Sequence, residues 1–408
     1  MSITFSQPFA EPKGSPIREL FPYLSLPGMI SFAGGYPSPS LFDSEGLRDA
    51  AAEALTAGGV AFQYGSTEGD VSLREQLSAL MAHRGLDCPS GRILVTTGSQ
   101  QAFDIVVRVL MNRGDVAYVE TPAYPATIQA LALAGTRIVQ VPVDSDGLNV
   151  ATLEEMLRAA CPKDRPKILY TVPTFSNPCG TRLSLDRRER LVQLALEFEF
   201  VIVEDDPYSE LAFTDERLLP IYAVASRCVT PEQNPVVYLS SLSKTVAPAL
   251  RIGWMVASPA VLRRSAIAKQ TMDLCTSPVS QAIAASYLAS GRYPATVASA
   301  CAEYGRRMST MATALQSHLG NRVQFDKPTG GMFLWGRMGD GIDPTRVFKE
   351  AVDLGVVYVP GHAFYASNPD ANTFRFSYAA PDCKQIETGV ARFAEALEKA
   401  GSALANSD

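Results

Sequence analysis

A lysine at the end of a predicted strand has the most specific chemical context in this chain. Lys244 lies in Ser240-Ser241-Leu242-Ser243-Lys244-Thr245, directly after the apolar run 236–239, and Arg251 follows seven residues later. A primary amine can bind an aldehyde covalently, and hydroxyls together with an arginine can bind a phosphate. Pyridoxal 5′-phosphate (PLP) requires both kinds of group. The alternative is that Lys244 only marks the end of a strand.

Two earlier strand ends carry residues suited to other parts of such a cofactor. Thr97-Gly98-Ser99-Gln100-Gln101 opens a predicted helix, where a glycine and free backbone N–H groups favour a bound anion. Glu120-Thr121-Pro122-Ala123-Tyr124 places an aromatic ring after a proline, and such a ring can stack on a flat heterocycle. Taken singly, Ser99 is also an ordinary helix cap, and Tyr124 is also a typical core residue.

Two further strand ends, between Tyr124 and Lys244 in the chain, supply an amide and an acid. Asn177 lies in Thr174-Phe175-Ser176-Asn177-Pro178-Cys179-Gly180, where it is a neutral donor, although Asn-Pro is also a common turn signal. Asp205 and Tyr208 lie in Glu204-Asp205-Asp206-Pro207-Tyr208. An acid about 4 Å from a protonated pyridine nitrogen contributes roughly 4 kcal/mol at an effective dielectric of about 20. Because ligands of open α/β sheets bind outside the carboxyl ends of the strands, we expect these side chains to gather at one edge.

The spacing of short apolar runs predicts an α/β protein whose sheet is mostly parallel and has seven strands. The strands are expected at Ile93–Thr96, Val116–Val119, Ile138–Val141, Ile168–Val172, Val201–Glu204, Val236–Leu239 and Ile252–Val256. Helices are expected between several of them, at Gln101–Met111, Tyr124–Ala134 and Leu185–Glu199. This alternation of buried strands and helices is typical of a parallel sheet.

After Gln270 the pattern changes and predicts a smaller α/β domain. Its helices are expected at Ser280–Ser290, Tyr293–Leu319 and Lys384–Lys399, and its strands at Met332–Trp335, Val356–Val359 and Thr373–Ser377. We therefore divide the chain into an N-terminal arm (1–45), a large cofactor-binding domain (46–275) and a small C-terminal domain (276–408). The arm is rich in proline and has room for one short helix near Ile17–Phe21.

The composition is that of a globular protein and argues against several other classes. The chain has 408 residues, of which 47% are hydrophobic and 19% charged, and its net charge of −6 gives no support to nucleic-acid binding. The seven cysteines are scattered without a CxxC pair, and the three histidines are isolated, so we expect neither disulfides nor a metal site. We see no signal peptide and no membrane span, and we expect a cytoplasmic protein.

These strand-end motifs resemble those of the class I and II PLP-dependent aminotransferases of fold type I. The resemblance covers nearly the whole chain, and it is carried by the segment around Lys244, by Asn-Pro-x-Gly at 177–180 and by Asp-x-x-Tyr at 205–208. It implies that Lys244 binds the cofactor and moves the substrate proton, while Asp205 meets the pyridine nitrogen and Tyr124 stacks on the ring. Asn177 and Tyr208 would then bind the ring oxygen. Phosphate contacts would fall to Ser99, Gln100, Ser241, Ser243 and Arg251.

The same resemblance assigns a substrate site and a partner subunit. Arg375, in Phe374-Arg375-Phe376-Ser377, matches the arginine that binds the substrate α-carboxylate, and Asn177 and Gly35 are assigned beside it. A planar guanidinium binds a carboxylate through two hydrogen bonds and keeps its charge. Without the resemblance, Arg375 would be taken as a charge on an edge strand. Tyr64 matches a tyrosine that reaches the phosphate of the neighbouring subunit, which implies a homodimer with shared active sites.

Within this family the N-terminal segment resembles that of the 2-aminoadipate and kynurenine aminotransferases. There a mobile N-terminal helix covers the substrate and its arginine meets a distal carboxylate, a position that Arg18 matches. Arg18 is equally well explained as a helix-surface charge beside Glu19. Tyr36 replaces a leucine common in that branch and favours aromatic or apolar substrates.

The expected reaction is a ping-pong transfer of an amino group from an L-amino acid to a 2-oxo acid such as 2-oxoglutarate. Two departures from the family pattern, Ala249 and Cys179, do not touch this chemistry. A β-lyase on the same cofactor residues is an alternative that the sequence separates poorly. A non-catalytic PLP-binding sensor domain is another, but no basic helix-turn-helix precedes Gly34-Gly35. The preferred amino donor cannot be predicted from these residues.

Overall fold

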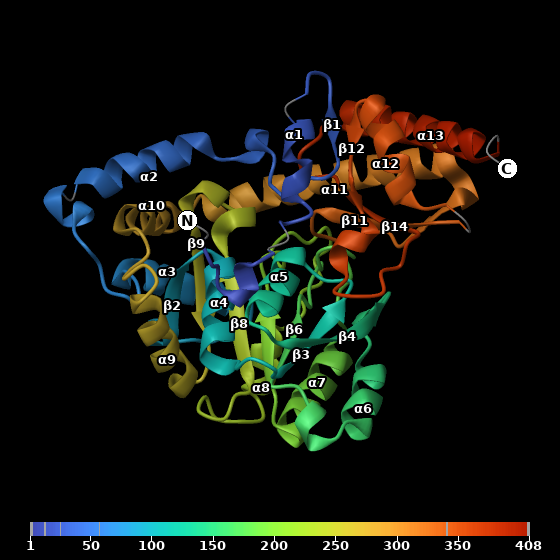
Figure 1. Ribbon diagram of the computed structural model, residues 1–408. Coiled ribbons are helices and arrows are strands. Elements are labelled where there is room, and N and C mark those ends of the chain that lie inside the picture. The colour runs from blue at the N-terminus through green and yellow to red at the C-terminus, as the bar shows by residue number, and fades with distance from the viewer. Residues whose placement is uncertain (1–2, 12–13, 25, 57, 340–341, 406–408) are drawn as a thin grey trace.

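The computed structural model describes residues 3–11, 14–24, 26–56, 58–339 and 342–405, and it contains one large and two small sheets. The large sheet fills the lower half of the molecule in Figure 1. Its strands run in the order β2 (Ile93–Thr97), β9 (Ile252–Val256), β8 (Val236–Ser241), β7 (Val201–Asp205), β6 (Ile168–Thr171), β3 (Val116–Thr121), β4 (Arg137–Asp144) and β5 (Gly147–Leu148).

All seven predicted strands are present, and β5 is an eighth that the apolar pattern did not predict. From β8 to β4 every pair is parallel, while β9 runs antiparallel to both of its neighbours. β5 has only two residues and pairs with the end of β4 as a tight hairpin, so it carries no periodic signal. The prediction of a mostly parallel sheet in an α/β protein is confirmed.

Both faces of this sheet are buried because successive side chains of a strand point to opposite sides. On β8, Val237 and Leu239 belong to one apolar core, whereas Val236 and Tyr238 belong to the other. The first core is covered by α4 (Ser99–Leu110), α5 (Pro125–Leu133) and α9 (Pro259–Gln270). The second is covered by α3 (Val71–His83), α6 (Val150–Ala159), α7 (Leu185–Phe198), α8 (Ile221–Ala225) and α10 (Pro278–Ala289).

The remaining elements lie above the large sheet in Figure 1. The long helix α11 (Tyr293–Leu319) packs against α13 (Cys383–Ala405). The antiparallel sheet beside them runs in the order β10 (Val323–Phe325), β11 (Phe333–Met338), β14 (Thr373–Ser377) and β13 (Val359–Pro360). The predicted strand Val356–Val359 is divided, because β12 (Val356–Val357) pairs with β1 (Ile30–Ser31) while β13 pairs with β14. α12 (Pro344–Asp353) completes this part.

The N-terminal segment rises from the middle of the molecule to β1 at its top and then enters the long helix α2 (Ser44–Thr56), against which α10 packs. It contains short 3-10 turns at Gln7–Phe9 and Arg18–Leu20, and the latter continues into α1 (Phe21–Leu24). This agrees with the short helix predicted near Ile17–Phe21. The three-part division at 45 and 275 stays a prediction. Across the described ranges, no helix is long and apolar enough to cross a bilayer.

Candidate active site

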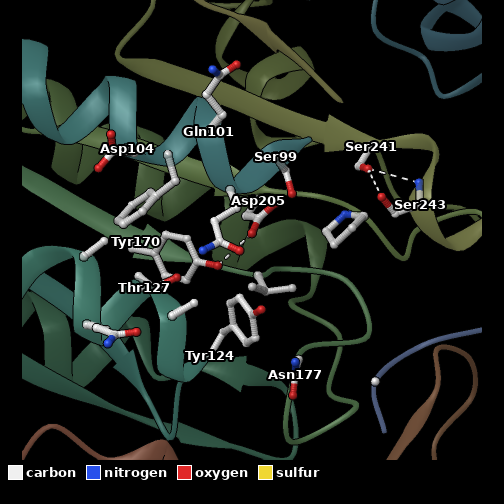
Figure 2. A pocket seen from close by; sticks show the side chains of 18 of the residues that line it. Ser99, Gln101, Asp104, Tyr124, Thr127, Tyr170, Asn177, Asp205, Ser241 and Ser243 are labelled. Carbon is white, nitrogen blue, oxygen red and sulfur yellow. Dashed lines mark hydrogen bonds between the residues drawn. The ribbon is translucent and has the colours of Figure 1, made fainter. Parts of the chain in front are cut away.

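The carboxyl ends of the central strands open into one cavity of about 790 Å³. Figure 2 shows side chains from α4, α5, β6, β7 and the ends of β8 converging on it. Every site residue predicted from the sequence lines this cavity except Arg18 and Tyr64. Those that line it are Gly35, Tyr36, Ser99, Gln100, Tyr124, Asn177, Asp205, Tyr208, Ser241, Ser243, Lys244, Arg251 and Arg375.

Lys244 lies in a 3-10 turn, Leu242–Lys244, that begins where β8 ends. Its Nζ donates a hydrogen bond to the carbonyl oxygen of Gly35 at 2.8 Å. The pKa of Lys244 is lowered from 10.5 to about 8, chiefly by burial and also by the positive charges of Arg375 and Arg251, against the opposing effect of Asp205. A lysine with this pKa has a substantial deprotonated fraction near neutral pH, so it can act as a nucleophile or a base.

Asp205, the last residue of β7, lines the cavity and has one carboxylate oxygen without a partner among the described residues. Its Oδ2 accepts a hydrogen bond from the Tyr170 hydroxyl at 2.8 Å, while its buried Oδ1 has no partner within the described residues. Burial raises the pKa of Asp205 to about 6, although the Tyr170 hydrogen bond and Lys244 favour the charged form. A buried oxygen without a donor is costly, so this acid fits the protonated ring nitrogen of PLP.

The start of α4 forms a cradle between two glycines and Arg251. Gly98 caps the helix with φ +83°, and an added Cβ there would lie 2.5 Å from Nη2 of Arg251. A Cβ on Gly253 would lie 2.5 Å from the Gly98 carbonyl carbon. Only glycine therefore lets these two segments approach each other, and the free N–H groups of the first helical turn then face the cavity with the Arg251 guanidinium.

Two serines complete the cradle on the side of β8. The Ser241 hydroxyl donates to the Ser243 hydroxyl at 2.7 Å (Figure 2) and lies 3.0 Å from the Ile252 carbonyl oxygen, which it can also reach. The backbone N–H of Ser243 donates to the same Ser241 oxygen at 3.0 Å. These bonds hold both hydroxyls at the cavity wall opposite the start of α4.

Arg375 comes from β14 of the small sheet and reaches the same cavity although its side chain is fully buried. Its Nη1 donates to Oδ1 of Asn177 at 2.7 Å and its Nη2 donates to the Ala33 carbonyl, whereas its Nε has no partner among the described residues. The guanidinium lies over the rings of Phe333 and Phe364, 4.4 and 5.0 Å from their centroids.

Burial lowers the pKa of Arg375 to about 10, so the side chain keeps its charge near neutral pH. A positive charge held over two aromatic rings, with no carboxylate partner in the described part of the chain, suits a substrate carboxylate. Asn177 accepts from Arg375 through its amide oxygen, which leaves its NH₂ group free to donate.

Tyr124 and Tyr208 enclose the cavity from the large sheet. Tyr124 caps α5 and is partly buried (Figure 2), and Tyr208 packs edge-on against Phe333 with ring centroids 5.8 Å apart. Burial raises the pKa of both hydroxyls, and the negative charge of Asp205 adds to this effect. Both tyrosines are therefore donors at physiological pH.

The two remaining predicted residues lie elsewhere. Arg18 is exposed and does not line the cavity, whereas its neighbours Ile17 and Phe21 do. Tyr64 is 78% exposed and lies outside the cavity of its own chain. No three His, Cys, Asp or Glu side chains gather as a metal site in the ranges that the structure covers.

Sequence reasoning missed several residues of this site. Tyr170 was read only as part of a buried strand, and Phe333 and Phe364 were not considered. No local pattern marks these side chains, because each contributes through a partner distant in sequence. An amine, an acid, an anion cradle and a buried arginine in one α/β cavity together define a PLP-binding site.

Comparison with known proteins gives the family. Residues 33–393 match the family model described as aminotransferase class I and II. The chain is 39% identical over 399 residues to the aromatic-amino-acid aminotransferase 1 of Thermococcus litoralis, covering 97% of this chain and 94% of the relative. It is 36% identical over 401 residues to the 2-aminoadipate transaminase of Thermus thermophilus, covering 97% and 98%.

Comparison with solved structures supports the same family. The α-aminoadipate aminotransferase of Thermus thermophilus complexed with N-(5′-phosphopyridoxyl)-L-leucine superposes with a TM-score of 0.89 at 35% identity, over 98% of each chain. The chain therefore belongs to the class I and II aminotransferases, has the fold of the PLP-dependent enzymes of fold type I, and is a PLP-dependent transaminase. The cofactor, the enzyme class and the branch predicted from the sequence are confirmed.

Proposed function

We propose that this enzyme transfers the amino group of an L-amino acid with an aromatic or large apolar side chain, or of 2-aminoadipate, to a 2-oxo acid such as 2-oxoglutarate. The order is ping-pong, in which the first product leaves before the second substrate binds. The observation that carries the proposal is that Arg375 and Lys244 open into one cavity, since the first can bind an α-carboxylate while the second exchanges a proton at the α-carbon.

Each residue of the cavity has a distinct role in this reaction. PLP, when bound, supplies an aldehyde that reacts with amines and a ring that accepts an electron pair. Arg375 binds the substrate carboxylate and so fixes the α-carbon, while Lys244 removes the α-proton and returns it. Asp205 holds a proton on the ring nitrogen, and the Ser99, Ser241 and Arg251 cradle binds the phosphate.

The donor class is supported by the cavity wall near Gly35. Ile17, Phe21, Tyr36 and Tyr124 line it, and they present apolar or aromatic surface to a substrate side chain. Arg18 does not line the cavity, so it can bind the side-chain carboxylate of a substrate such as 2-aminoadipate only by turning inward. The names of the relatives fit both donors, because one is an aromatic-amino-acid enzyme and the other a 2-aminoadipate enzyme.

We further propose a cytoplasmic homodimer in which Tyr64 completes the phosphate site of the partner subunit. Tyr64 and Phe62 are 78% and 68% exposed, an unusual exposure for two aromatic side chains only two positions apart. The size of the particle in solution tests the dimer. Tyr64→Phe tests the shared site, since it should weaken PLP binding without dissociating the dimer.

A spectral titration of the PLP-loaded enzyme with single amino acids, without a 2-oxo acid, tests the function. We expect phenylalanine and leucine to convert the cofactor to its aminated form, and we expect 2-aminoadipate to do so only while Arg18 is present. Arg18→Gln should therefore slow 2-aminoadipate and leave phenylalanine unchanged. Release of ammonia and pyruvate from cystathionine, with the cofactor left unaminated, would instead favour a β-lyase.

A further inference from the structure

Tyr170 is the only side chain hydrogen-bonded to Asp205 in the part of the chain that the structure describes. It lies on β6 next to β7, with Tyr170 opposite Val203 and Asp205 two residues beyond. Its ring is fully buried and packs edge-on against Phe103 of α4, with centroids 5.0 Å apart. This packing fixes the ring, and the hydroxyl then reaches Oδ2 of Asp205 at 2.8 Å (Figure 2).

A second hydroxyl supports the first. The Thr127 side chain, on the first turn of α5, is also buried, and its hydroxyl near that of Tyr170 favours the charged form of the phenol. Figure 2 shows both residues on the same side of the cavity. Tyr170 donates its one proton to Asp205, so its oxygen can only accept from a neighbouring hydroxyl, and Thr127 supplies one. Thr127, Tyr170 and Asp205 therefore form a polar chain from three different elements, in which a hydrogen bond joins Tyr170 to Oδ2 of Asp205.

This chain has two physical effects on Asp205. Because Oδ2 is held by Tyr170, the carboxylate cannot rotate freely, and its orientation at the cavity is fixed. Because a donor stabilises the charged form, the hydrogen bond also lowers the affinity of the carboxylate for a proton. A neighbour of lower proton affinity leaves the shared proton on the cofactor ring nitrogen, and the positive charge of the ring is what draws electrons from the α-carbon.

We propose that Tyr170, supported by Thr127, is a positioning residue that keeps the ring nitrogen of PLP protonated by orienting Asp205 and weakening it as a base. Neither residue touches the reacting atoms. The inference rests on PLP binding in this cavity, and it adds to the proposed function a residue outside the strand-end motifs.

The test is the ¹⁵N chemical shift of the pyridine nitrogen in enzyme loaded with ¹⁵N-labelled PLP. In Tyr170→Phe the carboxylate loses its donor and becomes a stronger base, so we expect the shift to move towards that of an unprotonated pyridine. The PLP dissociation constant should rise and kcat should fall, each by about 10- to 150-fold, the range spanned by one hydrogen bond to a charged group. KM should change little, because Tyr170 does not touch the substrate.

Tyr358→Phe is the matched control, since Tyr358 is also fully buried and its hydroxyl donates to the Pro344 carbonyl in the small domain. It should cost stability without moving the ¹⁵N shift. Thr127→Val gives a second perturbation if Tyr170→Phe folds poorly, and it should produce a smaller shift in the same direction that Thr127→Ser restores. An unchanged ¹⁵N shift in Tyr170→Phe or Thr127→Val, or an equal shift in Tyr358→Phe, would overturn the proposal.

Discussion

Replacing Arg375 with lysine should cost this enzyme its recognition of the α-carboxylate while keeping a positive charge in place. The guanidinium of Arg375 is held by Asn177, by the Ala33 carbonyl and by two aromatic rings, and a lysine ammonium has neither the planar fork nor the reach to keep all of these contacts. At least one charge-assisted hydrogen bond to the substrate is then lost. Such a bond contributes about 1.5–3 kcal/mol, which corresponds to a loss of about 10- to 150-fold in kcat/KM.

The assay compares phenylalanine with phenethylamine, which has the same ring but no carboxylate, in the spectral half-reaction. Arg375→Lys should slow phenylalanine by the stated factor and leave phenethylamine nearly unchanged. Arg307→Lys is the control, because Arg307 is also buried but its partners, Glu303 and the Ala379 carbonyl, lie outside the cavity. If phenethylamine slowed as much as phenylalanine, the loss would reflect a distorted cavity and the assignment of Arg375 would be wrong.

Three further predictions concern the cofactor. Because the pKa of Lys244 is lowered to about 8, the rate at which the cofactor-free enzyme binds PLP covalently should rise with pH up to about 8 and level off above it; a plateau reached only near pH 10 would contradict the effect of burial. Lys244→Ala should leave the circular dichroism spectrum intact but yield no cofactor trapped by borohydride and lower kcat by about 10²–10⁴-fold, and near-normal turnover would refute its role. Gly253→Ala would force a Cβ against Gly98, so it should cost about 1–3 kcal/mol in the free energy of PLP binding or of unfolding, measured by titration and by thermal melts. Gly91→Ala is the control and should be neutral, because a Cβ there meets open space.

The parallel sheet explains why so much of this site could be predicted. Lys244, Asn177 and Tyr124 each follow a short buried strand and Asp205 ends one, and the carboxyl ends of parallel strands meet at one edge. Chain order together with strand pattern is then enough to bring them together. Both strand periodicity and turn residues are local signals, so they can be recognised without a structure.

The place of Arg375 in the site could not be predicted from local signals. Its strand was predicted, but its place beside Lys244 follows from the small sheet packing over the large one, which no periodicity encodes. Only the family resemblance connected the two residues. The positions of Arg18 outside the cavity and of Ile17 and Phe21 within it were likewise not predictable, because they depend on how a proline-rich segment lies against the cavity.

The sequence by itself determined the α/β class, the seven main strands, the family and most of the residues that line the cavity. The tertiary structure alone decided which oxygen of Asp205 is free, which rings enclose Arg375 and how far the pKa of Lys244 falls. The physical reason is that hydrogen bonds, burial and charge act over a few ångströms between residues far apart in the chain. Tyr170 reaches Asp205 across 35 positions through the register of two neighbouring strands, and that register is a property of the folded sheet.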